Sequence, residues 1–262
     1  MTGYLGVEVS FRVVSALKSA QVLPDGSAIR YIEIVGKGPS RVFVHGLGAS
    51  SAPYYAAAVS HPALAGHRSL LMDMLGFGIS DRPADFAYTL EDHADVLATA
   101  ITAAADGQHV DLIAHSMGGA VAIVLAHRHP HLVRRLVLVD ANLDPVPPHV
   151  SGSGIGRYTE QQFLDEGGRA ETLDRVGPQW AATMRLAGPV ALYRSAIHLY
   201  AGTRPTMRAM LGQLTIPWTF LYPEPEQAPL SSGDVVAVPD TGHNIMLDNI
   251  DVFARETARA LS

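Results

Sequence analysis

The sequence contains no cysteine among its 262 residues. Disulfide bridges, thiolate metal sites and a cysteine nucleophile are therefore excluded. The chain also lacks an excess of basic residues, because its formal net charge at pH 7 is −6. A basic face is the usual footprint of nucleic-acid binding, so no nucleic-acid partner is expected.

Long apolar runs are missing as well. No apolar stretch reaches the roughly 18 residues that predict a membrane span, and the first residues, MTGYLGVE, combine no basic start with an apolar run. We therefore expect no signal peptide and no membrane partner, and we expect a cytoplasmic location. With 48% hydrophobic and 17% charged residues, the chain can bury one large core.

Strand and helix patterns alternate along the chain. The expected elements are a hairpin over 18–35 around Pro24-Asp25-Gly26, strands at 41–44, 69–73, 109–114 and 134–139, and helices at 89–105 and 118–128. This alternation predicts an α/β protein with a mostly parallel sheet and helices on both faces. Such sheets bind ligands beyond the carboxyl ends of their strands.

One serine lies at the end of an apolar run, in the stretch HVDLIAHSMGG at 109–119. Small residues surround Ser116, namely Ala114, Gly118 and Gly119. They leave room for a strained turn from strand to helix, which predicts a nucleophile elbow. The usual G-x-S-x-G pattern has glycine where this chain has Ala114, so strand and helix must lie slightly further apart.

A glycine-rich turn, HGLG at 45–48, follows the strand at 41–44. Glycines free the backbone N–H groups of such a turn to point inward. The tetrahedral intermediate of acyl transfer carries a negative oxygen, which two fixed N–H donors stabilise best. We assign these oxyanion donors to the backbone of Leu47 and Met117.

A serine hydroxyl needs an imidazole within hydrogen-bond reach to take its proton and return it to the leaving group. Among the 12 histidines, His243 lies on a loop after a late strand, where the chain order serine, acid, histidine places the base. His127, His129 and His131 lie around a helix end, where a solvated terminus is expected, and we expect no metal site there.

Two further segments follow in order, DMLGFGISDRP at 73–83 and AHRHPHLVRRLVLVD at 126–140. Together with HGLG, the Ser116 turn and Gly242-His243, they resemble the α/β-hydrolase superfamily over nearly the whole chain. The resemblance implies the α/β-hydrolase fold, with a core domain at 1–140 and 212–262 and a helical cap insertion at 141–211. Asp73 and Asp81 are expected to brace the active-site edge through hydrogen bonds to local backbone.

The resemblance leaves the third triad member open. In most of the superfamily the acid follows the strand before the histidine strand, where this chain has Glu226. Some relatives, such as haloalkane dehalogenases, carry it directly after the strand at 134–139, where this chain has Asp140. The loop of Glu226 must complete a parallel crossover in about twelve residues, three of them proline. We therefore favour Asp140, with Glu224 and Asp144 as further alternatives.

We expect cap aromatic residues to line an apolar pocket over Ser116. The predicted substrate contacts are His45, Phe77, Tyr158 and Trp180. The predicted function is a cofactor-free, metal-free serine hydrolase, a carboxylesterase or lactonase acting on a small, largely apolar molecule. C–C bond hydrolases and perhydrolases use the same residues, and a catalytically silent ligand-binding receptor is the alternative outside the enzymes. The expected partner is the small-molecule substrate, and homodimer formation stays open.

Overall fold

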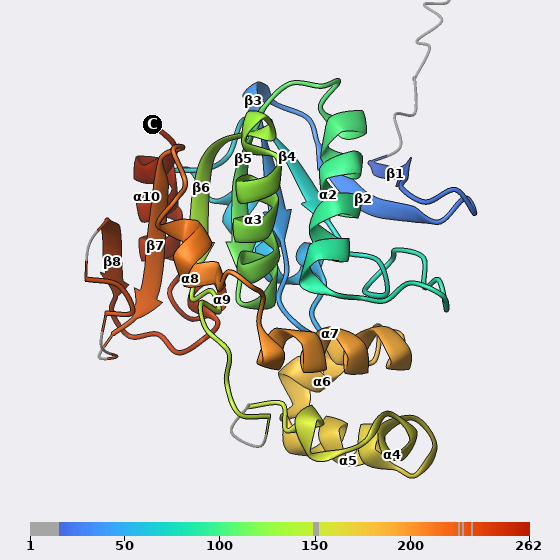
Figure 1. Ribbon diagram of the computed structural model, residues 1–262. Helices are drawn as coiled ribbons and strands as arrows, with labels where there is room; N and C mark the ends of the chain where they lie inside the picture. The colour runs from blue at the N-terminus through green and yellow to red at the C-terminus, as the bar shows by residue number, and fades with distance from the viewer. Residues whose placement is uncertain (1–15, 149–151, 225, 227, 232) are drawn as a thin grey trace, which may run out of the picture.

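The computed structural model describes residues 16–148, 152–224, 226, 228–231 and 233–262. Within these residues, eight strands form one sheet in the order β1-β2-β4-β3-β5-β6-β7-β8 (Figure 1). β2 pairs antiparallel with β1 and β4, whereas the pairs from β4 to β8 are all parallel. The mostly parallel sheet predicted from the sequence is confirmed. The strands are β1 (Leu17–Gln21), β2 (Ala28–Ile34), β3 (Lys37–Val44), β4 (His67–Met72), β5 (Val110–His115), β6 (Val133–Val139), β7 (Trp218–Pro223) and β8 (Asp234–Val238).

Helices cover both faces of the sheet. In β3, Val42 and Val44 pack on one face while Phe43 packs on the other, because successive strand residues point in opposite directions. α2 and α3 bury the first face, and α1 and α10 bury the second; Figure 1 shows α2 and α3 in front of the sheet. The helices of the two faces are α1 (Ser51–Ser60), α2 (Leu90–Ala104), α3 (Met117–Arg128), α9 (Ile245–Asp248) and α10 (Ile250–Leu261).

Local sequence accounts for several element boundaries. In the first hairpin, the Asp25 carboxylate accepts a hydrogen bond from the backbone N–H of Ser27, and Gly26 adopts a φ of +94° that favours glycine. α2 begins at a capping box in which Thr89 and Asp92 each accept from the other's backbone N–H. The predicted hairpin and helix are both confirmed.

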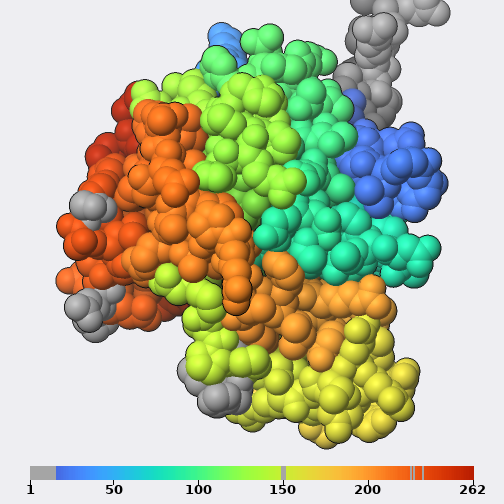
Figure 2. Space-filling model, in the orientation of Figure 1, coloured from blue at the N-terminus to red at the C-terminus, as the bar shows by residue number. Residues whose placement is uncertain are grey.

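A helical segment lies between β6 and β7. The segment leaves the sheet at the carboxyl end of β6, and the surface of α4 to α7 lies beneath that of the core (Figure 2). α8 instead contacts α3 of the core. The boundaries of a cap domain at 141–211 remain a prediction. The inserted helices are α4 (Glu160–Asp165), α5 (Gly168–Arg175), α6 (Pro178–Met184), α7 (Pro189–Ala201) and α8 (Met207–Leu211).

The connection from β7 to β8 is short. The two strands are parallel, yet the described residues between 223 and 234 form no helix. This parallel crossover is therefore short, as expected from its length and its prolines. Among all described helices, none is both long and apolar enough to cross a membrane.

Asp73, directly after β4, ties the active-site edge together. Its buried carboxylate accepts hydrogen bonds from the Ser50 hydroxyl at 2.9 Å, the backbone N–H of Ser51 at 2.6 Å and that of Ile79 at 3.0 Å. A Cβ on Gly78 would lie 1.8 Å from Asp73 Oδ2. The loop can therefore come this close to the carboxylate only with glycine at position 78. The bracing role expected for Asp73 fits this geometry. Asp81 accepts the backbone N–H of Ala28 at 3.0 Å and forms an ion pair with Arg30.

Replacing Asp73 with alanine should destabilise the fold by about 3 kcal/mol, because three buried donors lose a charged acceptor. The measurement is the free energy of unfolding in urea. Asp165→Ala is the matched control, since Asp165 is exposed at the end of α4 and should change the stability by less than about 0.5 kcal/mol. Equal stability of the two variants would contradict the bracing role.

Candidate active site

Ser116 lies at a sharp turn between β5 and α3. Its φ of 53° and ψ of −122° are strained for a residue with a side chain, at a cost on the order of 1–3 kcal/mol. The turn exists because neighbouring backbone comes close: a Cβ on Gly118 would lie 2.3 Å from the carbonyl oxygen of His45, and one on Gly119 would lie 2.4 Å from Cβ of Ala141. These contacts explain the small residues that follow Ser116.

His243 connects Ser116 to a carboxylate. Its Nε2 lies 2.9 Å from Ser116 Oγ, and its Nδ1 lies 2.5 Å from Oδ2 of Asp140. His243 is on the loop after β8, and Asp140 directly follows β6. Because parallel strands end at one edge of the sheet, three residues far apart in the sequence meet there.

The other candidate acids lie elsewhere. Glu224 and Glu226 are exposed, and Asp144 forms an ion pair with Arg208. Of the four carboxylates considered from the sequence, only Asp140 lies within hydrogen-bond distance of the His243 ring. The geometry therefore favours Asp140 as the orienting acid.

Two backbone donors lie beside Ser116. Met117 begins α3, so its N–H has no acceptor within the helix. The N–H of Leu47 likewise donates to no carbonyl of the described residues. A Cβ on Gly46 would lie 3.0 Å from the Cβ of Ser116, which puts the turn that carries Leu47 directly against the serine. Both N–H groups are thus free to bind a ligand oxygen.

Trp180 holds this turn from the other side. Its indole Nε1–H in α6 donates to the carbonyl oxygen of Leu47 at 2.8 Å. Met184, one turn later in the helix, packs on Gly48. The inserted segment therefore restrains the turn that carries one of the two free donors.

His115 was not predicted as a site residue. Burial lowers the pKa of His115 well below its usual range, and the charge of neighbouring His243 lowers it further. The neutral ring donates from Nε2 to the backbone carbonyl of His243 at 2.9 Å, and the two rings lie 4.6 Å apart. His115 thus fixes the His243 loop. Its position next to Ser116 was the available sequence signal.

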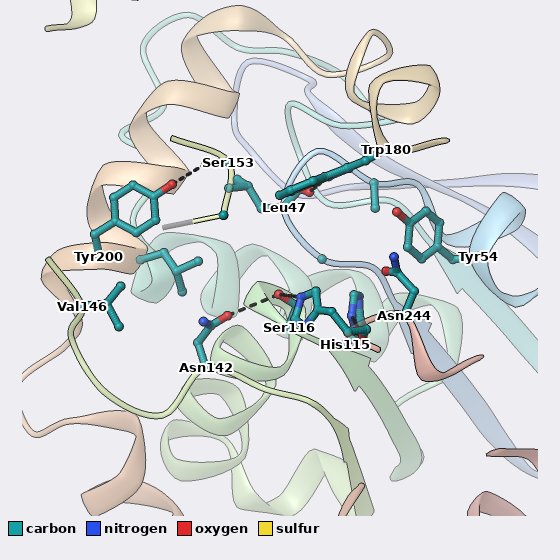
Figure 3. A pocket seen from close by; sticks show the side chains of 15 residues that line it. Leu47, Tyr54, His115, Ser116, Asn142, Val146, Ser153, Trp180, Tyr200 and Asn244 are labelled. Atoms are coloured by element: carbon teal, nitrogen blue, oxygen red, sulfur yellow. Dashed lines mark hydrogen bonds between the residues drawn. The ribbon is translucent and has the colours of Figure 1, made fainter. Parts of the chain in front are cut away.

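The site opens into one pocket of about 460 Å³, a size suited to a small molecule. Figure 3 shows Ser116 on its floor with Trp180 and Leu47 opposite. Apolar and aromatic side chains dominate the walls, and a few polar groups interrupt them. The lining residues are Gly46, Leu47, Ala49, Tyr54, His115, Ser116, Asn142, Val146, Gly152, Ser153, Trp180, Leu199, Tyr200, His243 and Asn244.

Of the four predicted substrate contacts, Trp180 lines the pocket and three do not. His45 is fully buried and accepts the Met74 N–H at Nε2. Phe77 packs against that ring, 5.4 Å away, and Tyr158 donates to Glu171 at 2.6 Å. The expectation for these three is corrected: His45 and Phe77 pack in the core, and Tyr158 packs in the inserted segment against Phe163.

Two asparagines that were not predicted from the sequence, Asn142 and Asn244, line the pocket. Asn142 lies two residues after Asp140, and its Oδ1 lies 3.3 Å from Ser116 Oγ. Asn244 directly follows His243 and lines the same pocket (Figure 3). Their adjacency to the two triad candidates was the only sequence signal.

The histidines near the end of α3 bind other partners. His127 contacts Gln213 at 3.0 Å, and His129 contacts Asp95 at 3.1 Å. Among the described residues, no group of three or more histidine or carboxylate side chains could hold a metal ion. This cluster therefore gives no support for a metal centre.

Comparisons with known proteins agree with the fold. Residues 42–224 match the family model described as the alpha/beta hydrolase fold. The chain is 39% identical over 104 residues to 2-hydroxymuconate semialdehyde hydrolase of Pseudomonas putida, a match covering 40% of this chain and 37% of that protein. It is 32% identical over 122 residues to the probable lysophospholipase BODYGUARD 4 of Arabidopsis thaliana, which covers 47% and 29%. Each match thus spans less than two fifths of the relative's length.

A solved structure resembles the chain along most of its length. The esterase EaEST of Exiguobacterium antarcticum superposes with a TM-score of 0.75 at 20% identity, covering 95% of this chain and all of the esterase chain. This likeness concerns the fold, which agrees with the strand order and the family match. The chain belongs to the α/β-hydrolase fold family.

Proposed function

We propose that this chain is a serine hydrolase that cleaves a carboxylic ester or lactone of a small, largely apolar molecule. The observation that carries the proposal is the continuous contact from Asp140 through His243 to Ser116 on the pocket floor. A carboxylate, an imidazole and a hydroxyl in this order form the arrangement that activates serine for acyl transfer.

The proposed reaction proceeds in two halves. Ser116 Oγ attacks the carbonyl carbon while His243 Nε2 takes its proton, and Asp140 stabilises the imidazolium that forms. The N–H groups of Leu47 and Met117 bind the negative oxygen of the tetrahedral intermediate. His243 then protonates the leaving oxygen, and an acyl-serine remains. Water, activated by His243, releases the acid and restores Ser116.

The pocket limits the substrate. Its volume of about 460 Å³ admits a molecule of modest size, and its walls favour apolar groups. In this proposal the inserted segment acts as a cap, since Trp180, Leu199 and Tyr200 all reach the pocket from it. Because of this limited volume, we favour a small-molecule ester over a macromolecular substrate.

C–C bond hydrolysis is a second candidate. The 39% identity to a 2-hydroxymuconate semialdehyde hydrolase favours it, and a serine triad could serve that chemistry as well. The two candidates differ in the bond that is cleaved. Parallel assays on a simple ester and on a vinylogous 1,5-diketone separate them, because only a C–C hydrolase turns over the diketone.

The wild-type protein should hydrolyse short-chain p-nitrophenyl esters, and Ser116→Ala should lower kcat by at least about 10⁴-fold, because it removes the hydroxyl that contacts His243 Nε2. The measurement is the steady-state release of p-nitrophenol. Ser60→Ala is the control, since Ser60 is exposed at the end of α1 and should retain full activity. If wild type and Ser116→Ala are equally inactive while a ligand raises the melting temperature, the enzyme assignment fails.

Asp140→Asn should lower kcat by about 10⁴-fold, the loss that removal of the orienting carboxylate causes in a well-studied triad. Glu226→Gln should change kcat by less than about twofold, because this exposed side chain is not involved in orienting the imidazole. Both variants are compared in the same ester assay, with circular dichroism to check folding. Loss of turnover in Glu226→Gln with near-normal activity in Asp140→Asn would contradict the choice of acid.

A further inference from the structure

Asn142 has hydrogen-bonding capacity that the protein does not use. Its Oδ1 lies 3.3 Å from Ser116 Oγ, while no described residue accepts a hydrogen bond from its Nδ2. The residue is half-buried and lines the pocket. A side-chain amide provides two N–H donors. A bound molecule that displaces water from this part of the pocket leaves them unpaired unless it supplies an acceptor, which costs free energy.

The position of His243 distinguishes the leaving-group side of the pocket from the acyl side. In the proposed reaction its Nε2 protonates the leaving oxygen, so the leaving group lies beside the imidazole. The His243 ring packs on His115, and Figure 3 shows His115, Asn244 and Tyr54 on one side of Ser116. That side is the leaving-group subsite.

The acyl group then lies on the opposite side of Ser116. Figure 3 places Asn142, Val146 and Tyr200 there, and Leu199 also lines the pocket. Because the acyl carbon bonds to Ser116 Oγ, the first atoms of the acyl chain come within reach of an amide that is itself 3.3 Å from that oxygen. Beyond Asn142 the walls are mainly apolar.

We infer that Asn142 is a specificity-determining residue that donates a hydrogen bond to an oxygen near the scissile carbonyl of the acyl group. The preferred substrates are then esters of short oxygen-bearing acids, such as alkoxyacyl or oxoacyl esters, with an apolar end. Oδ1 faces Ser116 Oγ at 3.3 Å, so the groups of Asn142 that face away from the serine are the Nδ2 donors, and the substrate group is an acceptor. This inference rests on the proposed function and adds the class of acyl group.

Two esters of equal length test the inference. p-Nitrophenyl methoxyacetate and p-nitrophenyl butanoate differ by one ether oxygen in place of one methylene. The measured quantity is the ratio of their kcat/KM values, in which effects common to both esters cancel. Asn142→Leu should lower this ratio by about tenfold relative to wild type, because one hydrogen bond to the substrate is lost.

Matched variants sharpen the experiment. Asn142→Asp replaces the donors with acceptors and should lower the ratio at least as much. Asn244→Leu makes the same substitution in the leaving-group subsite and should leave the ratio unchanged. Melting temperatures establish that each variant is folded, and Asn142→Ser serves where Asn142→Leu does not fold.

The outcomes separate this inference from the proposed function. If wild type hydrolyses both esters but the Asn142 variants keep the wild-type ratio, the inference is wrong and the serine hydrolase assignment stands. If Asn244→Leu lowers the ratio and the Asn142 variants do not, the subsites are reversed and the inference is wrong. If wild type hydrolyses neither ester, the proposed function fails and the inference with it.

Discussion

The sharp turn at Ser116 is the constraint on which the pocket floor depends. A side chain at a φ of 53° is tolerated only where the surrounding backbone fixes it. Gly46 lies against the serine, and Gly118 lies against the carbonyl of His45. The same close approach leaves the N–H groups of Leu47 and Met117 beside Ser116, so one packing requirement both exposes the hydroxyl and assembles its neighbouring donors.

The inserted segment is coupled to this floor at several points. Trp180 binds the carbonyl of Leu47, the N–H of Gly188 donates to the carbonyl of Gly76 at 2.8 Å, and Arg82 donates to the carbonyl of Leu186 at 2.6 Å. These bonds connect α6 and the start of α7 to the two loops that follow β3 and β4. Changes in the inserted segment can therefore alter the donor geometry as well as the shape of the pocket.

Patterns local in the sequence predicted most of the fold. The elbow at Ser116 and the strand runs before it depend on neighbouring residues, and the position of His243 depends on chain order. The acid was harder, since Asp140 and Glu226 both follow strands, and only the folded distances distinguish them. His45, Phe77 and Tyr158 were wrongly placed in the pocket because burial and pocket lining give the same aromatic pattern. Asn142 was missed because its contact with Ser116 is visible only in space.

Covalent labelling tests the central claim most directly, because it reports the activated hydroxyl without requiring the right substrate. A fluorophosphonate forms a stable adduct with an activated serine, and digestion with mass spectrometry locates it. The account predicts one adduct per chain, on Ser116, in the folded protein, and none after denaturation. An adduct on another serine, or no adduct in the folded protein, would contradict the assignment of Ser116 as the nucleophile.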